Sequence, residues 1–113
     1  MRREEVISLD HDTVYLTIAE AAELINQRHM SSLELTNAVL DRISETQPLT
    51  NAFITIMTDS ARAEATAADN FPFDRSHRGP LHGIPMSVKD VYATKGIMTS
   101  WGTAALEDNV PDV

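Results

Sequence analysis

One lysine, Lys89, lies in an apolar segment that two glycines and two prolines precede. The segment runs Gly79-Pro-Leu-His-Gly-Ile-Pro-Met-Ser-Val-Lys-Asp-Val91. The chain has only two lysines among its nine basic residues. A cationic amine among apolar neighbours loses hydration, and this loss favours the neutral amine, which can accept a proton. The residue types around Lys89 therefore make it a candidate general base.

A lysine in such a segment also has a purely structural interpretation. An isolated lysine in a strand commonly lies at a sheet edge, where it discourages aggregation, or extends its amine back to solvent. Because a perturbed ionisable group is only a statistical pointer to function, spacing alone favours this structural role for Lys89.

The elements that would position Lys89 are two turns and a strand. Gly79-Pro80 and Gly83-Ile-Pro85 have turn chemistry, since glycine permits positive φ and proline extends the residue before it. Residues 86–91 are apolar on both faces, which predicts a short strand buried in a parallel sheet. Lys89 would then lie near the carboxyl end of that strand, where open α/β sheets bind ligands.

The segment from Gly79 to Asp90 resembles the lysine-bearing motif of the amidase signature family. The pattern of that family is close to Gly-Pro-Leu-x-Gly-Ile-Pro, a few mostly apolar residues, and Lys-Asp. The resemblance extends from about Leu16 to the end of the chain. The other matching positions are Ser32-Leu-Glu-Leu35, Ile43, Asn51-Ala-Phe-Ile54, Thr94-Lys-Gly96, Thr99, Gly102-Thr103 and Pro111-Asp112.

The resemblance implies a catalytic role for Lys89. Members of the family use a serine nucleophile, a second serine with a cis peptide bond, and a lysine. The lysine takes a proton from the bridging serine, which activates the nucleophile, and an acyl-enzyme forms. Asp90 is expected to orient neighbouring groups. The other supporting positions of the motif are Gly79, Pro80, Gly83 and Pro85.

The two catalytic serines of the family have no counterpart here. The family carries them in a Gly/Ser-rich loop well beyond the lysine, where backbone amides form the oxyanion hole. Ser31-Ser32 has no glycine nearby and is typical of a helix start, while Ser87 and Ser100 lack the glycine context. We therefore expect both serines to lie outside this chain, and the chain alone to be inactive.

The resemblance also implies an α/β fold: the amino-terminal part of a mixed sheet covered by helices, incomplete as an isolated domain. Residues 1–15 are expected to be a polar leader, and residues 16–113 a truncated portion of an amidase domain. A β-branched run at 51–57 predicts a second buried strand.

Three helices are predicted from local signals. Thr17-Ile-Ala-Glu20 and Ser31-Ser-Leu-Glu34 are capping-box patterns that open the first two. The second helix should stop by Gln47, because Pro48 disfavours helical backbone in the residue before it. An alanine-rich third helix should run from Asp59 to about Asn70.

Composition restricts the class of protein. The 113 residues include no cysteine, so a disulfide framework is impossible and a cytoplasmic location is expected. The formal net charge of −8 argues against direct contact with nucleic acid or an anionic membrane. No stretch is long enough to cross a bilayer.

Other candidate sites are weaker. Asp10-His-Asp12 could be drawn as metal ligands, but a solvated loop is the more common explanation, because real sites need several convergent ligands. His77 and His82 flank the turn before Pro85, and a surface role is the default for both. His82 stands where the family often has a small residue, which leaves open a contact with substrate or a neighbouring loop.

The function expected from the resemblance is cleavage of a small carboxylic amide to an acid and an amine or ammonia, without metal or organic cofactor. Two alternatives stay open. One is the glutaminase-type A subunit of a tRNA-dependent amidotransferase, which would need a partner subunit. The other is a non-catalytic interaction module that binds a partner or forms a homo-oligomer.

Overall fold

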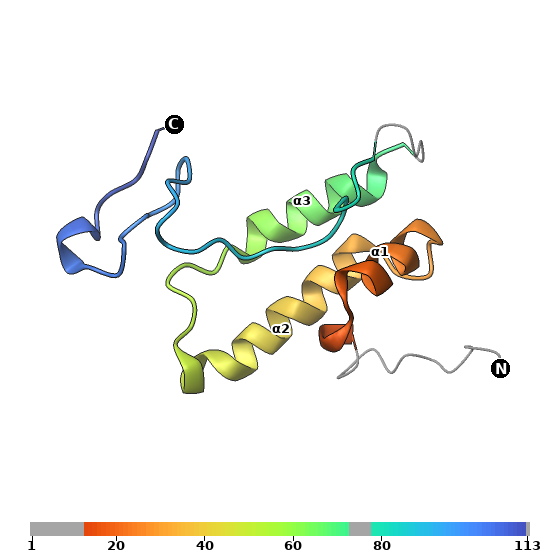
Figure 1. Cartoon of the computed structure of the whole chain (residues 1–113), viewed down its shortest axis with the longest axis horizontal. Coiled ribbons are helices and arrows are strands. Elements are labelled where there is room, and N and C mark those ends of the chain that lie inside the picture. Colours follow the sequence, from red (N-terminus) through yellow and green to blue (C-terminus); the bar gives the residue numbers. More distant parts are fainter. Residues whose placement is uncertain (1–12, 73–77, 113) are drawn as a thin grey trace. The chain divides into compact units, whose positions relative to one another are not determined.

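The computed structural model describes residues 13–72 and 78–112 (Figure 1). Its elements, in chain order, are η1 (Thr13–Tyr15), α1 (Ile18–Asn26), α2 (Ser32–Thr50), α3 (Thr58–Asn70) and η2 (Ala104–Leu106). The chain divides into two compact units. The helical unit comprises the described parts of Met1–Asn51 and Met57–Pro85, and the loop unit comprises those of Ala52–Ile56 and Met86–Val113.

The expected mixed sheet is wrong for this structure, because the described residues contain helices but no strand. Both segments predicted as strands, 51–57 and 86–91, are irregular. Their β-branched and apolar residues favour a strand only where a neighbouring strand supplies hydrogen bonds. No such neighbour lies in the parts of the chain that the structure describes, so an apolar composition did not by itself produce a sheet.

The two predicted helix starts are confirmed. Thr17 caps α1, and its Oγ1 accepts a hydrogen bond from the Glu20 N–H at 3.1 Å. Ser31 and Glu34 form a complete capping box at α2. Ser31 Oγ accepts from the Glu34 N–H at 3.0 Å, and Glu34 Oε2 accepts from the Ser31 N–H at 2.7 Å. Each cap satisfies backbone donors that the first turn leaves without an intrahelical partner.

The predicted end of α2 at Gln47 is wrong, because α2 continues through Pro48 to Thr50. A proline in the last turn removes one N–H donor but leaves the remaining bonds of the helix intact. Asn51 then ends α2 in the left-handed conformation, with φ of 44°, and its N–H donates to the Gln47 carbonyl at 2.8 Å. The third helix, Thr58–Asn70, agrees with the prediction to within one residue at its start.

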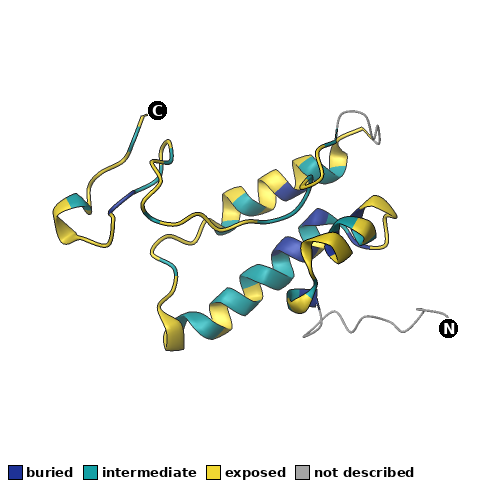
Figure 2. Cartoon of the chain, in the orientation of Figure 1, coloured by how far each residue is buried: buried dark blue, intermediate teal, exposed yellow. Residues whose placement is uncertain are grey.

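The core of the helical unit is small and is formed mainly by α1, α2 and the connection between them (Figure 2). Its buried residues are Ala21, Ile25, Met30 and Leu35, against which the partly buried Leu16, Leu24, Val39 and Ile84 pack. Ile84 belongs to the glycine-proline segment before the lysine. The turn part of the candidate motif is thus held against the helices by apolar contact.

Two further expectations concern the start of the chain and membranes. Residues 1–12 of the predicted polar leader, including Asp10-His-Asp12, lie outside the described residues, and so does His77. The end of that leader forms η1, which contacts α2. Of the helices that the structure describes, none combines the length and the hydropathy needed to span a membrane.

Candidate functional site

The predicted turns before the lysine are present in the helical unit. Residues 80–83 form a turn in which the His82 N–H donates to the Gly79 carbonyl at 3.1 Å. The Ile84 N–H donates to the Leu81 carbonyl at 3.1 Å, so a second turn follows directly. Together these bonds give the segment Gly79–Pro85 a defined backbone path.

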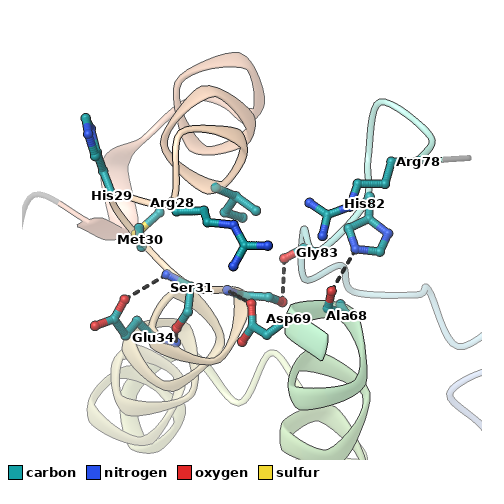
Figure 3. Close-up of a pocket in the computed structure, with 12 residues that line it drawn as sticks. Arg28, His29, Met30, Ser31, Glu34, Ala68, Asp69, Arg78, His82 and Gly83 are labelled. Atoms are coloured by element: carbon teal, nitrogen blue, oxygen red, sulfur yellow. Dashed lines mark hydrogen bonds between the residues drawn. The ribbon is translucent and has the colours of Figure 1, made fainter. Parts of the chain in front are cut away.

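Gly83 is the point at which this segment joins α2. Ser32 Oγ donates a hydrogen bond of 2.7 Å to the Gly83 carbonyl (Figure 3). The φ of Gly83 is +79°, which L side chains rarely adopt, and a Cβ there would lie 3.2 Å from Ser32 Cβ. The left-handed backbone and the close approach both require glycine at this position.

His82 contacts the end of α3. Its Nε2 lies 2.9 Å from the Ala68 carbonyl oxygen (Figure 3). The centroid of its ring lies 5.3 Å from that of the Phe71 ring. The sequence left open whether His82 contacts a substrate or a neighbouring part of the chain. In this structure it contacts the chain, and it ties the turn to α3.

A carboxylate from α3, that of Asp69, binds the first backbone amides of α2. Asp69 Oδ1 accepts from the Ser32 N–H at 2.7 Å, and Oδ2 accepts from the Leu33 N–H at 3.0 Å. Asp69 therefore supplies a second cap to α2, from a helix more than thirty residues away in sequence.

These contacts border a cavity of about 290 Å³. Figure 3 shows the side chains of Arg28, Arg78 and His82 around it, with Ser31 at the start of α2 and Asp69 in the last turn of α3. All of the residues that line it belong to the helical unit, and Lys89 is not one of them. The cavity is thus lined by turn residues of the motif and by helix residues, and the predicted base does not line it.

Lys89 lies in the loop unit, and its side chain is exposed. The expectation that its amine is buried is wrong for this structure. The physical reason is that the apolar neighbours meant to cover it are themselves exposed: Met86 is 81% and Val88 55% accessible. The backbone at Lys89 is nevertheless ordered by a turn, because its carbonyl accepts from the Tyr92 N–H at 3.1 Å.

Asp90 accepts four hydrogen bonds within the loop unit, three of them through its carboxylate. Its Oδ1 accepts from the Ser100 N–H at 2.9 Å, and its Oδ2 accepts from Ser100 Oγ at 2.5 Å and from the Gly102 N–H at 3.2 Å. The Trp101 N–H donates to the backbone carbonyl of Asp90 at 3.0 Å. We call the segment Ser100–Gly102 the clamp.

The clamp changes the acidity of Asp90. The hydrogen bond from the Ser100 hydroxyl, followed by that from the Ser100 N–H, holds the pKa of the Asp90 carboxyl below its ordinary value of 3.8. Each donor stabilises the carboxylate relative to the neutral acid. Asp90 is therefore an acceptor of hydrogen bonds at neutral pH and is poorly suited to donate a proton.

Sequence patterns do not indicate the roles that three residues have in organising this region: Ser32, Asp69 and Ser100. Ser31-Ser32 is typical of a helix start, and Ser100 lacks the glycine context of a catalytic serine. Asp69 offered no local signal, because its partners lie 37 and 36 residues away. No group of three His, Asp or Glu side chains within residues 13–72 and 78–112 could hold a metal ion.

Comparison with known proteins gives two findings. A family model described as Amidase matches residues 34–113. The A subunit of glutamyl-tRNA(Gln) amidotransferase from Dehalococcoides mccartyi (strain 195) is 47% identical over 100 residues, which cover 88% of this chain and 20% of that protein. The corresponding A subunits of Methylococcus capsulatus and Roseiflexus castenholzii are 44% and 43% identical, over 83% and 85% of this chain and 19% of each relative.

The chain therefore spans about a fifth of the length of the curated relatives that it matches. The family match includes the whole of the segment from Gly79 to Asp90, so the predicted resemblance is confirmed. The turn, the exposed lysine and the clamped carboxylate described above all belong to the matched region. This chain belongs to the amidase family.

Proposed function

We propose that this chain is the lysine-bearing segment of an enzyme that cleaves the C–N bond of a carboxylic amide. The observation that carries the proposal is that the motif Gly79–Asp90 lies wholly inside the family match over residues 34–113. The carboxylate of Asp90 is already bonded to Ser100 and Gly102, so the proposal gives the role of base to Lys89 and not to Asp90.

In the proposed mechanism Lys89 acts as a general base and then as a general acid. Its neutral amine takes a proton from a bridging serine, which in turn takes one from a serine nucleophile. The nucleophile attacks the amide carbon, the amine or ammonia leaves with a proton returned through the same relay, and water or another acceptor releases the acyl group. The 113 residues contain no Gly/Ser-rich loop, so both serines would come from outside the chain. No metal or organic cofactor enters this scheme.

We further propose that the enzyme is the glutaminase-type component of a tRNA-dependent amidotransferase. This proposal is supported by relatives that are 40–47% identical and are named as the A subunits of glutamyl-tRNA(Gln) amidotransferases. The small-molecule substrate would then be the amide donor, glutamine, and the ammonia would pass to a partner subunit. The net charge of −8 favours a protein partner over direct contact with tRNA. The predicted cytoplasmic location stays a prediction.

A chimera tests the role of Lys89. This chain would replace its matching 100-residue segment in the Dehalococcoides mccartyi relative, co-expressed with the other subunits of that enzyme. We expect Lys89→Ala to lower the rate of acylation by glutamine by a factor of about a hundred or more, the usual scale for losing a positioned base. Release of ammonia in single-turnover experiments would measure this rate.

Lys95→Ala is the matched control, because Lys95 is the other lysine of the chain and is likewise exposed in the loop unit. Lys95→Ala should leave the rate of acylation within about twofold of that of the unsubstituted chimera, as expected of an exposed surface substitution. Equal rates for the Lys89 variant and the unsubstituted chimera would exclude the assigned base. Ammonia release by the 113 residues alone would contradict the proposal that the serines lie elsewhere.

A further inference from the structure

We propose that Asp90, held by the clamp Ser100–Gly102, is a positioning residue for Lys89. The proposal rests on the proposed function of Lys89 as the base, and it assigns to Asp90 and Ser100 a role in aligning that base. Asp90 would act through Lys89 and would not touch the substrate.

The clamp directs three successive backbone N–H groups at one residue. The amides of Ser100 and Gly102 donate to the two carboxylate oxygens of Asp90, at 2.9 and 3.2 Å, and the amide of Trp101 donates to its backbone carbonyl at 3.0 Å. Converging amides of this kind form an anion-binding concavity. The Ser100 hydroxyl adds a fourth, short bond of 2.5 Å.

The backbone of the clamp is strained in a way that Asp90 compensates. Trp101 and Gly102 have φ of 54° and 73°, so both lie in the left-handed region. A non-glycine residue such as Trp101 is unfavourable there by about 1–2 kcal/mol. Residues held in such conformations gather at functional sites, where surrounding bonds maintain them. The bonds to Asp90 maintain this turn together with two bonds inside it: the Gly102 N–H donates to Ser100 Oγ at 3.3 Å, and the Thr103 N–H donates to the Ser100 carbonyl at 3.0 Å.

The residues at the start of the clamp are also held by a later segment of the chain. Thr99 and Ser100 are buried, with 2% and 7% of their surfaces accessible, in a unit where most residues are exposed. The Thr99 N–H donates to the Asn109 carbonyl at 2.9 Å, and Asn109 Nδ2 donates to the Thr99 carbonyl at 3.0 Å. A pair of bonds to a later segment therefore fixes the residues that hold Asp90.

These contacts restrain the backbone immediately around Lys89. The next residue is held by four bonds from the clamp, and the Lys89 carbonyl is held by the Tyr92 N–H. A base must reach the proton that it accepts with a tolerance of a fraction of an ångström, and misplacement by about 1 Å can cost a hundredfold in rate. The backbone on the C-terminal side of Lys89 is thus restrained, while the Lys89 side chain is exposed.

The kinetic test uses the chimera defined above. Asp90→Asn keeps the size of the side chain but turns one acceptor into a donor that faces the clamp. We expect kcat to fall by about ten- to a hundredfold, with KM within twofold, because the base is misplaced and the substrate still binds. Ser100→Ala should lower kcat less than Asp90→Asn does. Ser100→Thr keeps the hydroxyl, so its kcat should be closer to that of the unsubstituted chimera than the kcat of Ser100→Ala is. Asp108→Asn, an exposed acid of the same unit, is the control and should match the unsubstituted chimera.

The Lys89 variants separate this proposal from the one on which it rests. If Lys89→Ala abolishes activity while Asp90→Asn retains kcat, the positioning role fails and the base assignment survives. If Lys89→Ala has no effect, the proposed function itself fails. A rise in KM with unchanged kcat for Asp90→Asn would also overturn the positioning role.

A measurement on the 113-residue chain covers the case in which a chimeric variant does not fold. We expect Asp90→Asn to lower the backbone ¹⁵N order parameter of Lys89 from the range of an ordered backbone, about 0.85, towards that of a flexible one, below about 0.6. Asp108→Asn should leave it unchanged. An order parameter for Lys89 that is the same in both variants would overturn the proposal.

Discussion

At the scale of single residues, the motif contains two positions whose identity follows from backbone geometry. Gly83 is required by its left-handed φ and its approach to Ser32, and Asp90 by the amides that converge on it. Both positions were predicted from the resemblance as supporting residues. The structure gives each a physical task, whereas Lys89, which lies between them in the sequence, is exposed.

Gly83→Ala should destabilise the helical unit by about 1–2 kcal/mol, because alanine at φ of +79° is strained and its Cβ would crowd Ser32. Urea unfolding followed by far-ultraviolet circular dichroism measures the change. Gly79→Ala is the control, since Gly79 has no positive φ and nothing lies within 4 Å of the added carbon. Identical midpoints for the two variants would contradict the strained-glycine argument.

The clamp should depend on pH through Asp90. The folded-state pKa of this carboxyl lies below the ordinary 3.8, so its ionised form stabilises the clamp above that value. This contribution is lost as the pH falls through the lowered folded-state pKa. The NMR shifts of the Ser100 and Gly102 amides should titrate together with an inflection below 3.8. An inflection at or above 3.8, or one that persists in Asp90→Asn, would refute the prediction.

At the scale of elements, the starts of the helices depend on local chemistry and the junction between them does not. The caps at Thr17 and Ser31 involve partners three residues away, so the sequence predicted both starts correctly. The end of α2 was predicted wrongly, because Pro48 is tolerated in a last turn that Asn51 completes. The second cap of α2, from Asp69, joins residues that local patterns do not connect.

Asp69→Ala should lower the free energy of unfolding of the helical unit by about 1 kcal/mol, the usual cost of losing a helix cap. Two amides of α2, those of Ser32 and Leu33, would lose their acceptor. Asp41→Ala, at an exposed helical position in α2, corrects for the higher helix propensity of alanine. If the urea midpoints of the two variants fall by the same amount, Asp69 does not stabilise α2 as a cap.

At the scale of the whole molecule, the two units differ in how their backbone is satisfied. The helical unit has intrahelical bonds and a small apolar core, whereas the loop unit depends on turns and on the clamp. Apolar side chains of the loop unit, such as Met86 and Val88, are exposed. Local stability should follow this contrast, because few buried contacts and exposed amides mean low opening free energies.

Hydrogen exchange should show the contrast directly. Within the described residues, no backbone bond to the amides of residues 86–89 was found, so these amides should exchange quickly. The Leu35 amide, bonded to the Ser31 carbonyl at 3.1 Å in a buried position, should be protected. NMR-detected exchange resolves both in one sample. Equal protection at residues 86–89 and at Leu35 would mean that the apolar segment is paired after all.

The amino-acid sequence by itself determined the family motif, the turn at Gly83 and the helix caps, because each depends on residues within a few positions of one another. Tertiary structure decided the rest: the bond from Ser32 to Gly83 across 51 residues, the cap from Asp69, and the exposure of Lys89. Strands and buried amines need neighbours from elsewhere in the chain. An apolar pattern expresses the tendency to be buried, and only the packed molecule supplies the surface that buries it.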